Sequence, residues 1–181
     1  LSGPSGKRFV LPVDINAHDY MFFATGTGIA PFRGMVLELL ARGCTRQITL
    51  IMGAPYATDL LYHDVFTQLA KTHQNFRYLT AISRESNGEG AGRLYVQDRL
   101  RVSFDVLREQ LQSESNLIYV CGIAGMELGI FQELARQLQE PAREGYMSID
   151  PSVLGEIDGW DRKMIYRQVK LTRRVMLEVY A

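Results

Sequence analysis

The sequence predicts an α/β fold with a doubly wound parallel sheet, and three observations carry this prediction. Short apolar runs typical of strands alternate with stretches whose apolar residues recur at helical spacing. The strand-like runs are almost continuously apolar, as a sheet covered on both faces requires. Three of these runs end at a glycine, at Gly26, Gly53 and Gly122, and another ends at Ser83 and Arg84. Because such sheets bind ligands at the carboxyl ends of their strands, this edge is the expected site.

Each element follows from its own local pattern. The expected strands are residues 20–24, 48–52, 76–82, 117–121 and 175–180. A first helix begins near Pro31, which suits a first helical turn, and ends at Gly43. Asp59 is expected to cap a second helix, and residues 94–111 form a helical stretch with a break near Ser103. Further helices are expected over 126–138 and 151–168.

Composition restricts the function classes. The chain has 181 residues, with 20 Lys and Arg against 20 Asp and Glu, so it lacks the basic excess typical of nucleic-acid-binding domains. The two cysteines, Cys44 and Cys121, are far apart, which indicates reduced thiols and a cytoplasmic location, and they are too few for a metal site in this chain. No apolar run approaches the roughly 18–20 residues of a membrane-spanning helix.

A glycine-rich loop between the first strand and the first helix is the strongest local signal. It reads Thr25, Gly26, Thr27, Gly28, Ile29, Ala30 and Pro31. Glycines let backbone N–H groups approach an anion, and the helix N-terminus behind them favours a pyrophosphate. The pattern differs from the three-glycine dinucleotide motif, because Pro31 holds the third position, and a tight turn without a ligand is the alternative interpretation.

Three more groups carry candidate chemistry. Ser83, Arg84, Arg93 and Tyr95 suit a phosphate monoester such as the 2′-phosphate of NADP, although solvated surface arginines would give the same pattern. Cys121, at a strand end, either faces a ligand or is a buried structural thiol. Tyr180 either stacks on a flat ligand or packs on the last strand. None of the three histidines forms a recognisable pattern with a cysteine.

Taken together, these motifs resemble the C-terminal NADP-binding domain of the ferredoxin–NADP⁺ reductase family. The resemblance includes the sequence Ala-Thr-Gly-Thr-Gly-Ile-Ala-Pro-Phe-Arg, which ends at Arg33. It extends over most of the chain, through residues 3–7, 23–33, 53–55, 60–62, 83–85, 93–97, 119–122, 125–127 and 178–180. Each piece is modest alone, but their order and spacing are specific.

The resemblance implies a role for each matching residue. The 25–31 loop would hold the pyrophosphate, and Ser83, Arg84, Arg93 and Tyr95 the 2′-phosphate. Tyr95, Gln97 and Ile123 would border the adenosine half, with Gly53, Ala54, Pro55, Gly122 and Met126 completing the cofactor-binding set. Cys121 would approach the nicotinamide, Glu178 would lie near the hydride-transfer centre, and Tyr180 would cover the flavin ring. The cofactors, rather than these side chains, perform the redox chemistry.

The same resemblance implies a larger protein. Residues 1–19 are interpreted as a connector from an FAD-binding domain and residues 20–181 as the NADP domain, with a family-variable insertion at 140–173. The expected activity is NADPH-dependent reduction of FAD, with onward electron transfer to an iron–sulfur acceptor. A cluster is expected in the parent protein or its partner. The 181-residue chain by itself is expected to be inactive.

Two departures from the plant-type pattern bear on the subfamily. Ala181 follows Tyr180, and the insertion, with Trp160, resembles the reductase component of benzoyl-CoA epoxidase systems. Di-flavin reductases share part of the loop motif, but Thr25 and Tyr180 favour the ferredoxin-reductase type. A non-catalytic NADP(H)-binding sensor and an interaction domain without a ligand are the remaining alternatives.

Overall fold

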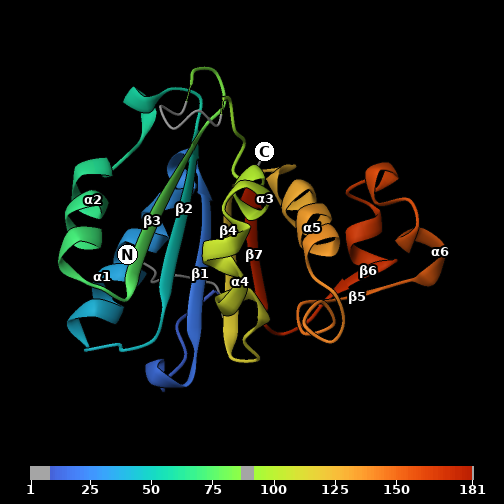
Figure 1. Ribbon diagram of the computed structural model, residues 1–181, viewed down its shortest axis with the longest axis horizontal. Helices are drawn as coiled ribbons and strands as arrows, with labels where there is room; N and C mark the ends of the chain where they lie inside the picture. The colour runs from blue at the N-terminus through green and yellow to red at the C-terminus, as the bar shows by residue number, and fades with distance from the viewer. Residues whose placement is uncertain (1–8, 87–91, 181) are drawn as a thin grey trace, which may run out of the picture.

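A single parallel sheet organises the chain. The computed structural model describes residues 9–86 and 92–180, so the motif at residues 3–7, the start of the expected connector and Ala181 lie outside the described residues. Five strands pair in the order β3-β2-β1-β4-β7, and every pair is parallel (Figure 1). The strands are β1 (Asp19–Thr25), β2 (Ile48–Ala54), β3 (Phe76–Ile82), β4 (Asn116–Ile123) and β7 (Val175–Tyr180). The expected strands and fold class are confirmed.

Helices cover both faces of the sheet, because the strands present apolar side chains in both directions. In β1, Tyr20 and Phe22 join the core beneath α1 and α2, whereas Met21 and Phe23 join the core beneath α3, α4 and α5. All four of these side chains are fully buried. The helices are α1 (Ile29–Ala41), α2 (His63–Thr72), α3 (Asp98–Val102), α4 (Phe104–Gln112) and α5 (Met126–Gln137). This is the doubly covered arrangement that continuous apolar strands predict.

The helix boundaries confirm some expectations and correct one. Gly43, with φ of 73°, follows the end of α1, and Ser103 separates α3 from α4, as expected. The expectation that Asp59 caps the second helix is wrong. Asp59 ends a short 3-10 turn (Ala57–Asp59), and the buried Leu60 is extended, so α2 begins only at His63. Burying Leu60 requires this change of backbone direction before the helix.

The segment between α5 and β7, residues 138–174, contains short elements in place of the helix expected over 151–168, so that prediction is wrong. Strands β5 (Met147–Ile149) and β6 (Val169–Leu171) pair antiparallel, and α6 (Pro151–Leu154) is followed by 3-10 turns at Ile157–Gly159 and Met164–Tyr166. Trp160 turns inward between these pieces, and its indole N–H donates to the Val153 carbonyl at 2.9 Å. Burial of this side chain interrupts regular helix.

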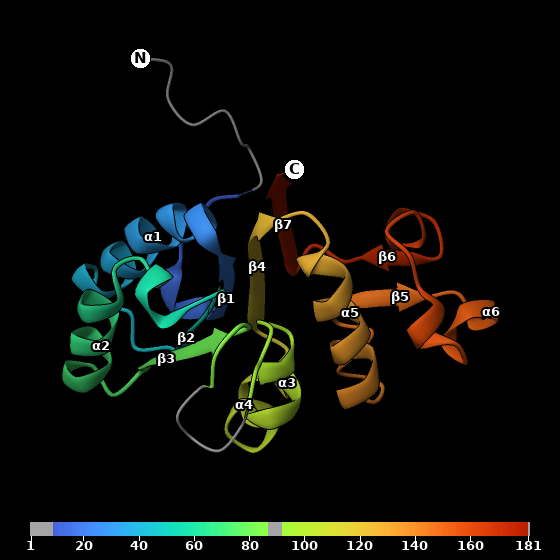
Figure 2. The same cartoon turned by 90° about the horizontal axis from the view of Figure 1, so that it is seen from above.

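The segment of residues 138–174 is called the β5–β6 unit below. Helix α5 lies between the main sheet and this unit. Both views of the fold show the unit at one end of the molecule, on the side of α5 away from β1 and β4 (Figure 2). Within residues 9–86 and 92–180, no helix has both the length and the apolar character needed to cross a membrane.

Candidate functional site

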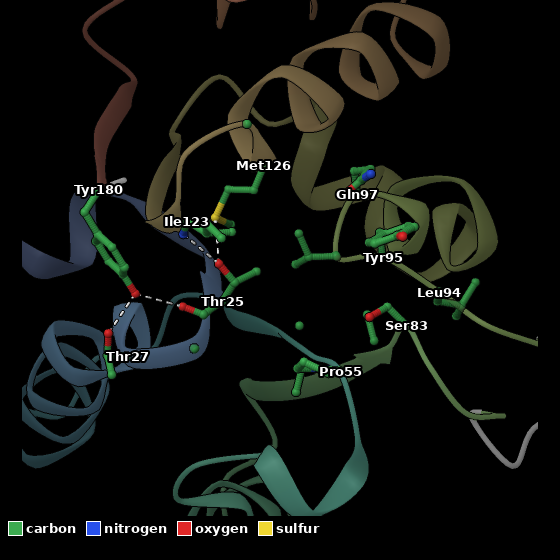
Figure 3. A pocket seen from close by; sticks show the side chains of 16 residues that line it. Thr25, Thr27, Pro55, Ser83, Leu94, Tyr95, Gln97, Ile123, Met126 and Tyr180 are labelled. Atoms are coloured by element: carbon green, nitrogen blue, oxygen red, sulfur yellow. Dashed lines mark hydrogen bonds between the residues drawn. The ribbon is translucent and has the colours of Figure 1, made fainter.

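A pocket opens at the carboxyl edge of the sheet, above the ends of β1, β2, β3 and β4. Its volume is about 640 Å³, within the roughly 300–1,000 Å³ usual for small-molecule sites. Figure 3 shows side chains that converge on it from opposite sides. The lining residues are Thr25, Gly26, Thr27, Gly53, Ala54, Pro55, Ala81, Ser83, Leu94, Tyr95, Val96, Gln97, Ile123, Gly125, Met126 and Tyr180. The pocket spans the point where the winding of the sheet reverses, between β1 and β4.

The glycine-rich loop forms a 3-10 turn, Gly26–Gly28, that leads directly into α1. Gly26 has a φ of 53°, which favours glycine, and lines the pocket. Gly28 packs against β4, where an added Cβ would lie 2.3 Å from the Cys121 carbonyl oxygen. This close approach brings the N-terminus of α1 towards the pocket. Ile29, Ala30 and Pro31 belong to the first turn of α1 and do not line the pocket.

Thr25 ties the ends of β1 and β4 together. Its hydroxyl oxygen accepts a hydrogen bond from the Ile123 N–H at 3.0 Å and donates to the Met126 sulfur at 3.2 Å. Gly122 makes room for this contact, because a Cβ there would lie 2.1 Å from the Thr25 hydroxyl oxygen. Thr25 therefore holds the two strand ends that form the floor of the pocket.

Tyr180 closes the pocket beside the glycine-rich loop. Its hydroxyl lies 2.8 Å from the Thr27 hydroxyl and donates to the Thr25 carbonyl at 3.3 Å (Figure 3). The ring is partly exposed, and it lies across the pocket from Ser83 and Tyr95 in the close-up view. The last strand thus contributes a flat side chain at the loop.

The four residues predicted to bind a 2′-phosphate occupy neighbouring backbone segments. The Leu94 N–H donates to the Ile82 carbonyl at 2.8 Å, which joins the segment containing Arg93 and Tyr95 to the end of β3. Ser83 and Tyr95 line the pocket. Arg84 and Arg93 are exposed and do not line it. Most of the loop between the arginines lies outside the described residues.

Cys121 and Glu178 lie beside the pocket without lining it. They are partners in the β4–β7 register, and Cys121 is 6% exposed. Burial, with a smaller contribution from the Glu178 charge, raises the pKa of the Cys121 thiol to about 11. At neutral pH the thiol is therefore protonated and a poor nucleophile. Glu178 is exposed and borders a separate groove with Phe9 and Met176.

Four pocket residues escaped the sequence-based prediction: Ala81, Leu94, Val96 and Gly125. Val96 comes within 3.1 Å of a Cβ built at Gly53, so the close contact of these two residues shapes the pocket wall. Gly125, with φ of 104°, precedes α5. Its position before a helix was the available sequence signal, because glycine is favoured where φ is positive. The three apolar residues carry no local signal of binding.

A metal centre has no support in the part of the chain that the structure describes. Among these residues, no three histidine, cysteine or acidic side chains are grouped so that they could hold a metal ion.

Comparison with known proteins supports an oxidoreductase assignment for this architecture. Residues 22–131 match the family of oxidoreductase NAD-binding domains. The root-type ferredoxin–NADP reductase of Nicotiana tabacum is 32% identical over 99% of this chain and 44% of its own length. A ferredoxin–NADP reductase of Spirulina sp. is 38% identical over 72% of this chain and 46% of its own length. The chain thus spans less than half of these relatives.

Structural comparison agrees at the level of the fold. The ferredoxin–NADP⁺ reductase of Plasmodium falciparum superposes with a TM-score of 0.65 over 95% of this chain and 57% of that chain, at 23% sequence identity. The sheet order, the pocket at its carboxyl edge and the match over residues 22–131 together show that the chain belongs to the oxidoreductase NAD-binding domain family.

Proposed function

We propose that the chain is the NADP(H)-binding domain of a flavin-dependent reductase and positions NADPH for hydride transfer to FAD. The observation that carries the proposal is the convergence of the glycine-rich loop, Ser83, Tyr95 and Tyr180 on one pocket at the switch point of the sheet. Parallel α/β sheets bind dinucleotides at this place.

The pocket residues fit the parts of the dinucleotide. Gly26 and the N-terminus of α1 offer backbone N–H groups and a positive dipole to the pyrophosphate. Tyr95 is 63% exposed and presents its ring for stacking on the adenine side, with Gln97 beside it in the pocket lining. Ser83 offers a hydroxyl to the 2′-phosphate, and Arg84 and Arg93 reach it from the adjoining exposed segments.

At the other end of the pocket, the chain orients the nicotinamide. Thr25, Ile123 and Met126 form a rigid floor, because the Thr25 hydroxyl contacts both other residues. The flat ring of Tyr180 would cover the flavin, and the nicotinamide would displace it on binding. The Cys121 side chain, a neutral thiol, would help to position the nicotinamide by its size. NADPH supplies the hydride and FAD accepts it, so the protein contributes binding and orientation.

The proposal extends to partners. FAD would be bound mainly by an FAD domain of the same polypeptide, and electrons would pass singly to an iron–sulfur acceptor such as ferredoxin. The 140–173 segment resembles that of the reductase component of benzoyl-CoA epoxidase systems. An epoxidase component in benzoyl-CoA degradation is therefore a second candidate for the electron acceptor. Cys44 and Cys121 are both free thiols, which suits a cytoplasmic enzyme.

Removing the proposed 2′-phosphate ligands tests the assignment. Arg84→Ala and Arg93→Ala should each weaken NADP⁺ binding by about 1.5–3 kcal/mol, because each removes a charge-assisted hydrogen bond. NAD⁺ binding should change little, since NAD⁺ lacks the phosphate. Isothermal titration calorimetry of each variant with both nucleotides measures the difference.

Arg173→Ala is the matched control. This exposed arginine precedes the amino end of β7, whereas the pocket lies at the carboxyl ends of the strands. It should bind both nucleotides as the unmodified chain does. If Arg84→Ala and Arg93→Ala weakened NADP⁺ and NAD⁺ binding equally, neither arginine would contact the 2′-phosphate.

A further inference from the structure

A buried carboxylate holds the turn that borders the pocket on the α5 side. Glu127, in the first turn of α5, is 1% exposed. One of its oxygens accepts a hydrogen bond from the Gly125 N–H at 2.6 Å, and the other accepts one from the Arg162 Nε at 2.7 Å. Both oxygens therefore have a donor, one from the pocket rim and one from the β5–β6 unit.

The turn that Glu127 holds is part of the pocket. Ile123, Gly125 and Met126 all line it. Gly125 has a φ of 104°, a conformation that glycine reaches without steric cost but that also leaves its backbone poorly restrained. The hydrogen bond from Glu127 supplies a restraint at this position. The shape of the pocket wall therefore depends on where the Glu127 carboxylate lies.

Arg162 contacts Glu127 from a segment that forms further contacts along α5. The Gln132 side-chain amide donates to the Ile157 carbonyl at 2.8 Å, and Arg136 forms an ion pair with Asp158. Trp160, between these contacts and Arg162, is 4% exposed. Figure 1 shows this segment packed along α5. Arg162 thus projects from an anchored backbone towards the end of α5 that borders the pocket.

We propose that Arg162 is a positioning residue for the nucleotide pocket, acting through Glu127 on the Gly125 turn. The inference rests on the proposed nucleotide-binding function and adds a residue that lies outside the pocket lining. Without the Arg162 guanidinium, a buried carboxylate oxygen loses its donor, which is costly, and the carboxylate is free to move away from Gly125. The pocket would then have to be ordered by the incoming nucleotide, which lowers affinity.

The first test compares nucleotide affinities. Arg162→Ala should weaken NADP⁺ binding about 3- to 30-fold by calorimetry, the range usual for residues that act without touching the ligand. Arg167→Ala, at an exposed arginine of the same segment, should leave affinity within about twofold of the unmodified chain. In a Glu127→Gln background, the Arg162→Ala change should cost little more, because both changes break the same link. Unchanged affinity in Arg162→Ala would overturn the proposal.

The second test does not depend on nucleotide binding. Hydrogen exchange at the Gly125 amide, followed by NMR in the free chain, should be at least about tenfold faster in Arg162→Ala and unchanged in Arg167→Ala. A chain that binds no NADP⁺ would contradict the proposed function, and the exchange rates would still decide the role of Arg162. Exchange at Gly125 that is equal in Arg162→Ala and the unmodified chain would show that Arg162 does not order the turn.

Discussion

At the scale of single residues, the pocket depends on side chains that restrain one another more than on side chains of unusual reactivity. Thr25 and Tyr180 each join segments that are far apart in the sequence. Cys121 is packed against the loop, and its burial raises its pKa to about 11. This cysteine is therefore suited to a packing role beside the pocket and unsuited to nucleophilic catalysis at neutral pH.

The raised pKa of Cys121 has a consequence for stability at alkaline pH. Between about pH 9 and 11 the unfolded chain loses the thiol proton while the folded chain retains it, so folding stability falls as pH rises. Denaturant unfolding at pH 8.5 and pH 10 should show a loss about 1 kcal/mol smaller in Cys121→Ala than in the unmodified chain. Equal losses in the two proteins would show that the thiol pKa is not raised.

Most candidate residues at the ends of strands were predictable from the sequence, because a parallel sheet brings its strand ends to one edge. Ser83 and Ile123 line the pocket for this reason. Arg84 and Arg93 were predictable as neighbours, but the direction of a long exposed side chain is not set by strand position. The role of Arg162 was not predictable, because it depends on how the 140–173 segment packs on α5.

At the scale of elements, the turn Gly26–Gly28 of the glycine-rich loop must satisfy two structural requirements. It must turn at Gly26 with positive φ, and it must bring the start of α1 into contact with the backbone of β4 at Gly28. The second requirement is steric and involves main-chain atoms, which cannot move aside as a flexible side chain can. The position of the α1 N-terminus relative to the pocket therefore depends on the absence of a side chain at Gly28.

Two glycines of this region make a matched pair of substitutions. Gly28→Ala should destabilise the fold by about 2–3 kcal/mol, because its Cβ would lie 2.3 Å from the Cys121 carbonyl oxygen. Gly34→Ala, in the middle of α1 with no atom within 4 Å of the new Cβ, should stabilise it by up to about 1 kcal/mol. Urea denaturation measures both. A Gly28→Ala protein as stable as Gly34→Ala would contradict the tight contact.

Strands were more predictable than helix boundaries, for a physical reason. A parallel strand that is buried on both faces is apolar along most of its length, as β1 and β2 are, so its pattern is visible in one sequence. The start of α2 depends on the buried Leu60, and the break-up of residues 151–168 depends on the buried Trp160. Both are tertiary effects that override local helical spacing.

At the scale of the whole molecule, the core on one face of the sheet continues through α5 into the β5–β6 unit. Met21 and Val120 of the sheet, Phe131 of α5, and Trp160 and Val169 of the unit belong to one contiguous buried cluster. The unit is therefore part of the same folding core as the sheet. This continuity would allow a residue of the unit, Arg162, to act on the pocket in the way proposed above.

The single tryptophan reports on this continuity. Trp160 is 4% exposed within the shared cluster, so its fluorescence should change in the same denaturant transition as far-ultraviolet circular dichroism. Coincident midpoints are expected because the two parts share buried contacts. A fluorescence transition at clearly lower denaturant would mean that the β5–β6 unit unfolds separately.

Calorimetric titration of the purified chain with NADP⁺ and, separately, with NAD⁺ tests most directly whether the pocket is an NADP(H) site. Ser83 in the pocket and the neighbouring Arg84 and Arg93 predict a clear preference for NADP⁺, because they would contact the one phosphate that NAD⁺ lacks. An advantage of about 1.5 kcal/mol or more for NADP⁺ is the expected result. Binding of neither nucleotide, or equal binding of both, would contradict the assignment.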